Sequence, residues 1–206
     1  MRTHWLLAAA ISSIVVGCGT QPASSRSAAD SILRVELLER GRVDQAVRQV
    51  WMEKLQRNVK PDSADWVRTL VADSANTDWL KETVRTHGWP GRSHVGPEAA
   101  GAAFLIVQHS PDTAFQREML DLIRQAVEAG EVDGQALALL TDRVEVQAGR
   151  PQIYGTQAKI IDGQVMLDPI DDSAHVDERR TQLGLQPLAE YVRLLDSAYT
   201  PRGRLH

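Results

Sequence analysis

Apolar positions recur at helical spacing over most of this 206-residue chain, with one short exception in its C-terminal third. Apolar side chains three and four residues apart are typical of an α-helix that buries one face. The pattern predicts helices at 31–39, 43–58, 62–75, 77–87, 99–107, 113–129, 133–147, 175–182 and 187–197. We therefore expect a mostly α fold consisting of a single helical domain.

Glycine, proline and capping residues mark the predicted helix ends. Gly41 is expected to end the first helix, and Pro61 stops the second. Thr77 or its neighbour Asn76 can cap a new helix, which Gly88 ends in the position typical of a C-terminal glycine. The Gly- and Pro-rich residues 88–93 are predicted to be a loop.

The most apolar segment after the N-terminal region is Ala99–Val107, which Pro97 introduces at a first helical position. Its nine consecutive small or apolar residues leave no polar face, so we expect it to be the central buried helix. The periodicity changes at Lys159–Ile161 and Gln164–Leu167, which flank an Asp-Gly pair. This pattern predicts one short β-hairpin.

The N-terminus is predicted to carry a targeting signal. A basic start containing Arg2 precedes the apolar run Leu6–Val16, which is too short to cross a bilayer and is typical of a secretory signal. Val15-Val16-Gly17-Cys18 then resembles a bacterial lipobox. The resemblance implies that Cys18 is lipidated, with acyl chains such as palmitate, and becomes the mature N-terminus. The alternative is an ordinary signal peptide with an incidental cysteine.

These features divide the chain into a signal peptide (1–17), a lipidated flexible tether (18–29) and a helical domain (30–206). Cleavage would remove Arg2 and change the formal net charge from −4 to −5. In the lipoproteins that the motif resembles, a residue other than Asp after the cysteine leads to the outer membrane. Gly19 therefore predicts a lipid-anchored protein of the cell envelope, facing the periplasm if the cell is Gram-negative.

Composition narrows the functional classes. The chain has 23 Lys and Arg against 27 Asp and Glu, so it lacks the basic balance of a sequence-independent nucleic-acid binder. Cys18 is the single cysteine, which excludes an internal disulfide framework and any multi-cysteine metal site. No phosphate-binding Gly-rich loop or nucleophile elbow is present, and we expect no cofactor.

Several short polar elements resemble an uncharacterised bacterial family, a domain of unknown function. They are Gly88-Trp89-Pro90, Gln108-His109, Asp142-Arg143 and Tyr154-Gly155-Thr156-Gln157. The resemblance implies no activity, and it indicates only that these elements belong to one domain.

Three of these residues, which lie within or at the ends of apolar helices, are candidates for a chemical role. His109 ends the apolar helix, where the helix dipole would favour an imidazolium and where a pKa near neutrality would suit general acid–base work. Asp142 lies among apolar residues and needs a partner or a proton. Arg143 points about 100° away from Asp142, so the two should serve different neighbours. In each case a purely structural hydrogen bond is the alternative.

Candidate ligand-binding residues follow in the C-terminal part. Tyr154, Thr156 and Gln157 can line a pocket, with Gly155 allowing close approach of the backbone, or they can form a loop that satisfies buried helix ends. Arg179, in a run of mixed charges, can clamp an anion if it turns inward.

Three functional hypotheses remain open. The first is a membrane-anchored domain that binds a small polar or anionic ligand, or an envelope protein, in a pocket lined by His, Asp, Arg and Tyr. The second is a hydrolase with His109 and Asp142 as its acid and base. The third is a structural interaction module without a site, which predicts an exposed apolar patch. Three histidines, His87, His94 and His109, match no metal motif, and we expect no metal.

Overall fold

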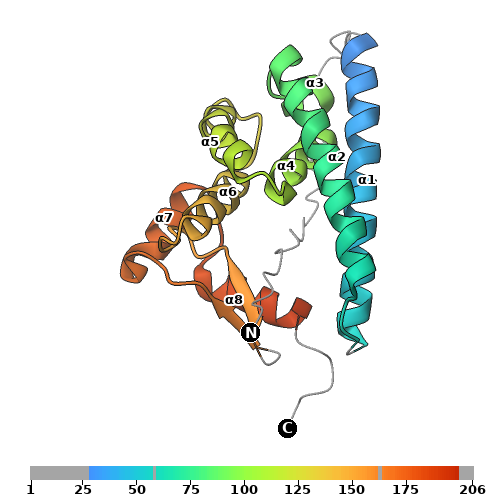
Figure 1. The fold of residues 1–206 in the computed structure, drawn as a ribbon. Helices are drawn as coiled ribbons and strands as arrows, with labels where there is room; N and C mark the ends of the chain where they lie inside the picture. Colours follow the sequence, from blue (N-terminus) through green and yellow to red (C-terminus); the bar gives the residue numbers. More distant parts are fainter. Residues whose placement is uncertain (1–27, 58, 162–163, 200–206) are drawn as a thin grey trace.

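The computed structural model describes residues 28–57, 59–161 and 164–199. Within these ranges the chain is mostly α with one short hairpin (Figure 1), which confirms the predicted fold class. The elements are α1 (Ala28–Gln56), α2 (Ser63–His87), α3 (Arg92–Val95), α4 (Pro97–His109), α5 (Thr113–Glu128), α6 (Gly134–Gln147), β1 (Ala158–Ile161), β2 (Gln164–Leu167), the 3₁₀ turn η1 (Ser173–His175), α7 (Val176–Gln182) and α8 (Leu188–Tyr199).

The two longest helices, α1 and α2, pack side by side as an antiparallel pair along one edge of the molecule (Figure 1). A capping box starts α2: the Asp65 N–H donates to Asp62 Oδ1 (3.0 Å), and the Asp62 N–H donates to Asp65 Oδ2 (2.8 Å). Lys54, near the end of α1, pairs with both of these carboxylates. The junction between the two helices is therefore held by local polar contacts.

The prediction that Gly41 ends a helix is wrong, because α1 continues through it for fifteen more residues to Gln56. A Cβ atom at this position would lie 2.8 Å from the Cβ of Ala102 in α4. Gly41 therefore lets α1 and α4 approach closely, and its role lies in packing rather than in ending the helix.

The predicted break at Asn76 and Thr77 is also absent, since α2 is continuous. The Thr77 hydroxyl lies within hydrogen-bond distance of the Asp73 carbonyl oxygen (2.7 Å) and of Ser110 Oγ (2.9 Å). The hydroxyl thus makes one hydrogen bond within α2, to the preceding turn, and another to the residue that follows α4. Gly88 does follow the helix as predicted, with φ at 74°, whereas part of the predicted 88–93 loop forms the short helix α3.

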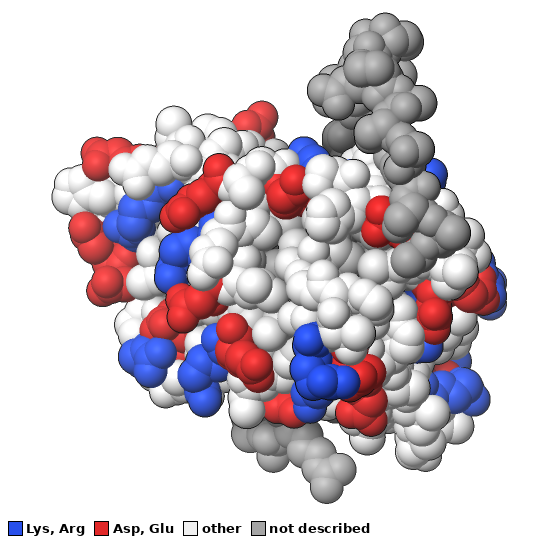
Figure 2. Space-filling view, turned by 90° about the horizontal axis from the view of Figure 1, so that it is seen from above, with Lys and Arg blue, Asp and Glu red and all other residues white. Residues whose placement is uncertain are grey.

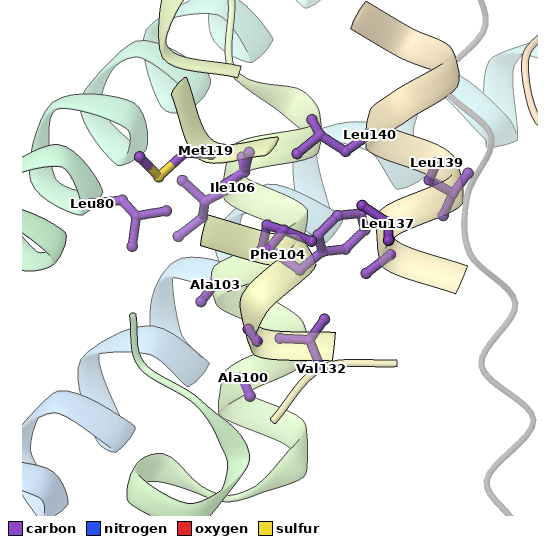
Figure 3. Packing of buried hydrophobic residues seen from close by; sticks show 14 of the residues in the cluster. Leu80, Ala100, Ala103, Phe104, Ile106, Met119, Val132, Leu137, Leu139 and Leu140 are labelled. Carbon is purple, nitrogen blue, oxygen red and sulfur yellow. The ribbon is translucent and has the colours of Figure 1, made fainter. Parts of the chain in front are cut away.

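The helix α4 is the central buried element, as its apolar sequence predicts. It packs against α1, α2, α3, α5 and α6, and Pro97 occupies its first turn. Figure 3 shows side chains of α4 such as Phe104 and Ile106 among leucines of α6 and Met119 of α5. The fully buried members of this cluster include Leu37, Leu80, Val95, Ala99, Ala103, Val107, Ile123 and Leu140.

The C-terminal part forms a smaller layer beyond α6. β1 and β2 pair antiparallel with Ala158 opposite Leu167 and Ile161 opposite Gln164, and α8 packs against β2. The predicted Asp162-Gly163 turn lies outside the described residues. On the face seen in Figure 2, acidic and basic side chains are interspersed around a broad area of uncharged residues.

Candidate functional site

The C-terminal end of α4 lies deep in the molecule, and its backbone is satisfied by a neighbouring helix. Gln116 of α5 is fully buried, and its Nε2 donates to the carbonyl oxygens of Val107 and Gln108, both at 3.0 Å. A buried helix end needs such partners because its last carbonyl groups have no intrahelical donor. The next residue is His109, the last residue of α4.

His109 is paired with a carboxylate from α1. Its Nδ1 lies 2.8 Å from Asp44 Oδ1 and 3.0 Å from Oδ2, and only 6% of His109 and 1% of Asp44 are exposed. A carboxylate can only accept hydrogen bonds, so Nδ1 of the neutral ring carries the proton. The unshared electron pair is then on Nε2, to which no described residue donates a hydrogen bond.

His109 is neutral at pH 7. Burial lowers its pKa to about 4, the positive charges of Arg48 and Arg143 act in the same direction, and Asp44 only partly opposes them. Desolvation thus outweighs the helix dipole, which favours the charged form by at most ~2 kcal/mol.

Asp44 belongs to a buried ionic network that links α1 to α2. Arg48 Nη1 donates to Asp44 Oδ1 (2.9 Å), and Arg48 Nη2 donates to both oxygens of Asp73 in α2 (2.9 and 3.0 Å). Gln45 Nε2 donates to Asp44 Oδ2 (2.8 Å). Burial raises the pKa of Asp73 to about 6, against the opposing effect of Arg48. Sequence analysis missed Asp44, Arg48 and Asp73, because a pair four residues apart on a helix is usually a surface ion pair.

Arg143 of α6 reaches the same region from the other side. With the Gln108 amide oxygen turned toward it, Arg143 donates to that oxygen from Nε (2.8 Å) and Nη2 (3.1 Å). Burial and the positive charge of Arg48 lower its pKa to about 10, so it stays protonated at pH 7. Arg143 is nevertheless partly exposed, and no carboxylate of the described residues forms an ion pair with it.

Asp142, next to Arg143, does not pair with His109. Its Oδ1 accepts from the N–H groups of Ile153 (2.7 Å) and Tyr154 (2.9 Å), and its Oδ2 accepts from the N–H (2.8 Å) and hydroxyl (2.9 Å) of Thr156. The two adjacent residues thus serve different neighbours, which confirms that prediction. Burial still raises the pKa of Asp142, although the four hydrogen bonds oppose the shift.

The segment Tyr154–Gln157 is used mainly as scaffold. Gln157 Nε2 donates to the Leu139 carbonyl oxygen (3.3 Å) and to Thr156 Oγ1 (3.1 Å). Gly155 has φ at 73°, and a Cβ there would lie 2.7 Å from a methyl group of Leu188. Glycine is required here for the left-handed backbone and for packing against α8. The polar contacts of the segment are with the middle of α6 rather than with a helix end.

Two arginines of α7 complete this scaffold. Arg179 donates from Nε to the Ile153 carbonyl oxygen (2.9 Å) and from Nη2 to those of Asp171 (2.6 Å) and Asp172 (3.0 Å). Arg180, which is buried, donates to the carbonyl oxygens of Gln186 and Tyr154 (both 2.7 Å). The structure therefore places Arg143 against Gln108 and close enough to His109 for its charge to act on the ring, while Thr156, Gln157 and Arg179 hold the loop.

Two further observations bear on the alternatives. Among the described residues, no group of three or more His, Cys, Asp or Glu side chains is placed to hold a metal ion. Exposed apolar side chains gather on the α1–α2 pair, as an interaction module would require: Ile32, Val35, Val43, Val50, Trp66, Val67, Leu70 and Val71. They coexist with the buried polar network, which that alternative does not predict.

Comparison with known proteins identifies the family but no activity. A family described as of unknown function, DUF6624, matches residues 31–203. The chain belongs to this family. The DUF6624 span includes Asp44, His109 and Arg143. No curated protein and no solved structure matches the chain.

The predicted lipid attachment site of this DUF6624 protein, Cys18, lies outside the described residues, as do the signal peptide and most of the tether. In the part of the chain that the structure describes, no helix has both the length and the apolar character needed to span a bilayer.

Proposed function

We propose that this DUF6624 protein is a lipoprotein of the cell envelope, anchored through Cys18, whose helical domain binds a small polar ligand beside His109 and Arg143. The lipobox after a short apolar run supports the anchor. The binding role rests on the polar groups that α1, α4 and α6 bring together around the end of α4.

The observation that carries the binding role is the incomplete pairing of Arg143. A guanidinium has five N–H donors. When it is largely buried, it normally pairs with a carboxylate or donates hydrogen bonds to several acceptors. Arg48 has two carboxylate partners. Arg180 has two carbonyl oxygens and lies over the ring of Tyr191. Arg143 has only the Gln108 amide oxygen among the described residues.

Arg180 and Arg143 also differ in how much of each residue is exposed to solvent. Arg180 is 1% exposed and is enclosed by the groups that it binds, as a structural residue would be. Arg143 is partly exposed, so a solute can reach it, and its charge acts on the buried ring of His109. A cation next to an acceptor at a partly open position is suited to a polar ligand.

The binding role is tested by measuring the melting temperature of the intact chain in detergent against a set of sugars, amino acids, organic acids and phosphates. A ligand at one hundred times its Kd should stabilise the fold by about 2.7 kcal/mol, a shift of roughly 5–10 °C for a domain of this size. Arg143→Gln should remove the shift, and Arg124→Gln, on the exposed face of α5, should keep it. If no compound shifts the melting temperature, or if Arg143→Gln responds like the unmodified chain, the proposal is wrong.

The anchor is tested separately by replacing Cys18 with alanine and fractionating the cells. The unmodified chain should partition with membranes and carry an acyl modification, whereas Cys18→Ala should remain in the soluble envelope fraction or accumulate unprocessed without the lipid. A variant that is processed and still carries the lipid would contradict the lipobox assignment.

A second candidate function, hydrolysis, is favoured by the Asp44–His109 pair. The pair leaves Nε2 of His109 able to take a proton from water while the water oxygen bonds to an ester or amide carbon. The resulting imidazolium would return the proton to the leaving group, and Arg143 would stabilise the negative charge. The carboxylate that orients His109 is Asp44, because both oxygens of Asp142 are bonded to the 153–156 segment.

Hydrolysis is tested by assaying a panel of anionic esters and amides with the unmodified chain, His109→Gln and Asp44→Asn. Activity that falls at least 100-fold in His109→Gln, with an unchanged melting temperature, would support catalysis. Turnover that survives this substitution would contradict it.

A further inference from the structure

The proposed ligand site combines a cation with an uncharged hydrogen-bond acceptor. We propose that its ligand is an anion that also carries a hydroxyl group, with the anionic oxygens on Arg143 and the hydroxyl donating to Nε2 of His109. This inference rests on the proposed binding function and specifies the chemical class of the ligand.

The anionic half follows from the donors of Arg143. Nε and one Nη2 hydrogen are directed to the Gln108 oxygen, which leaves both Nη1 hydrogens and the second Nη2 hydrogen without an acceptor among the described residues. Gln108 thereby fixes the plane of the guanidinium and leaves the Nη1–Nη2 end free. This end donates two parallel hydrogen bonds, the arrangement that recognises carboxylates and phosphates.

Local charge also favours an anion. The cation of Arg48 acts on Arg143 and opposes its protonation. Arg48 itself forms ion pairs with Asp44 and Asp73. A ligand anion would therefore supply the counter-charge that the described residues do not place on Arg143.

The hydroxyl half follows from the tautomer of His109. Because Asp44 accepts the Nδ1 hydrogen, Nε2 presents only an unshared pair. An anionic oxygen without a hydrogen would repel this nitrogen, whereas a hydroxyl hydrogen would form a bond with it. Arg143 is bonded to Gln108, the residue before His109, and its charge acts on the His109 ring, so the cation and the acceptor lie in the same region.

Two kinds of anion meet both conditions at neutral pH. Hydroxycarboxylates carry the hydroxyl on carbon, and inorganic phosphate keeps at least one proton on oxygen. Acetate and sulfate are their matched counterparts, with similar anionic groups and no hydroxyl. Comparing the two members of a pair measures the effect of the hydrogen bond to His109. Comparing one pair with the other distinguishes a carboxylate ligand from a phosphate ligand.

The experiment is calorimetric titration of the intact chain in detergent at pH 7.5 and constant ionic strength with glycolate, acetate, inorganic phosphate and sulfate. Within at least one pair, the hydroxylated anion should bind about 10- to 100-fold more tightly, because its counterpart leaves the acceptor unpaired. Arg143→Gln should abolish binding of both members of the pair. His109→Gln, whose amide can donate as well as accept, should bring their affinities within about threefold, and Arg124→Gln should change nothing.

The outcomes separate this inference from the proposed function. Equal affinity for both members of each pair in the unmodified chain would overturn the hydroxyl requirement. If none of the four anions binds while a neutral sugar or an amino acid shifts the melting temperature through Arg143, the inference is wrong and the binding role stands. If no compound binds at all, both fail.

Discussion

Replacing Asp73 by asparagine should make the stability of the fold fall more steeply as the pH is lowered. Asp73 and His109 lie in the same buried network, and burial displaces their pKa values in opposite directions, to about 6 and about 4. Their pH effects therefore oppose each other. Both groups respond to Arg48 and Asp44.

The sign for each group follows from where protons bind. Unfolded His109 regains its ordinary pKa of 6.5 and binds more protons than the folded form between pH 6.5 and 4, so this group lowers stability as the pH falls. Folded Asp73 binds more protons than its unfolded form, with a pKa of 3.8, between pH 6 and 4, so it raises stability as the pH falls. At about 1.4 kcal/mol per pKa unit, each effect amounts to ~3 kcal/mol, and the two nearly cancel.

The assay is urea unfolding followed by tryptophan fluorescence at intervals from pH 7 to pH 4, with each variant compared with the unmodified chain. Relative to that chain, Asp73→Asn should lose ~3 kcal/mol over this range and His109→Gln should gain a similar amount. Asp121→Asn, with a side chain 81% exposed, should run parallel to the unmodified chain. Parallel curves for the two buried variants, or changes of the same sign, would refute the assignment of a neutral His109 and a protonatable Asp73.

Two further predictions concern stability at pH 7, measured by the same urea unfolding. Gly41→Ala should cost ~1–3 kcal/mol despite the higher helix propensity of alanine, because the new Cβ would meet Ala102 at 2.8 Å. Gly101→Ala, with open space around it, should instead gain up to ~1 kcal/mol, and equal effects at the two glycines would contradict the packing role. Asp142→Asn should cost ~3–5 kcal/mol, because one acceptor oxygen is replaced by an amide group that faces N–H donors. A cost below ~1 kcal/mol, close to that of Asp121→Asn, would show that Asp142 does not hold the loop.

The helices and the hairpin could be predicted from sequence because their signals are local. Apolar periodicity, the proline at the start of α4 and the glycine after α2 each act over a few residues, and the structure contains the corresponding elements. Gly41 was misinterpreted because a glycine in a helical pattern suits either a helix end or a close contact between helices. Only the position of Ala102, sixty-one residues later, decides between them.

Only part of the candidate site could be predicted, because some of its residues have a local sequence signal and others depend on the tertiary fold. His109 and Arg143 stand out as polar residues in apolar helices, whereas Asp44 and Arg48 look like an ordinary exposed pair in the α1 sequence. Their burial depends on α2 and α4, which lie against α1 only in the folded chain. The partner assigned to His109 was therefore the conspicuous carboxylate Asp142 rather than the one that the fold brings to it.

The opposite bonding of Asp142 and Arg143 also determines how α6 is rotated about its own axis. Residues Ala136–Leu140 of this helix are all buried, so hydrophobicity alone favours no particular face. A rotation by one residue, about 100°, in one sense would bring the carboxylate toward the Gln108 oxygen, and a rotation in the opposite sense would bring the guanidinium toward the N–H groups of the 153–156 segment. Both encounters are repulsive, so two neighbouring side chains of opposite charge specify an orientation that the apolar residues leave undetermined.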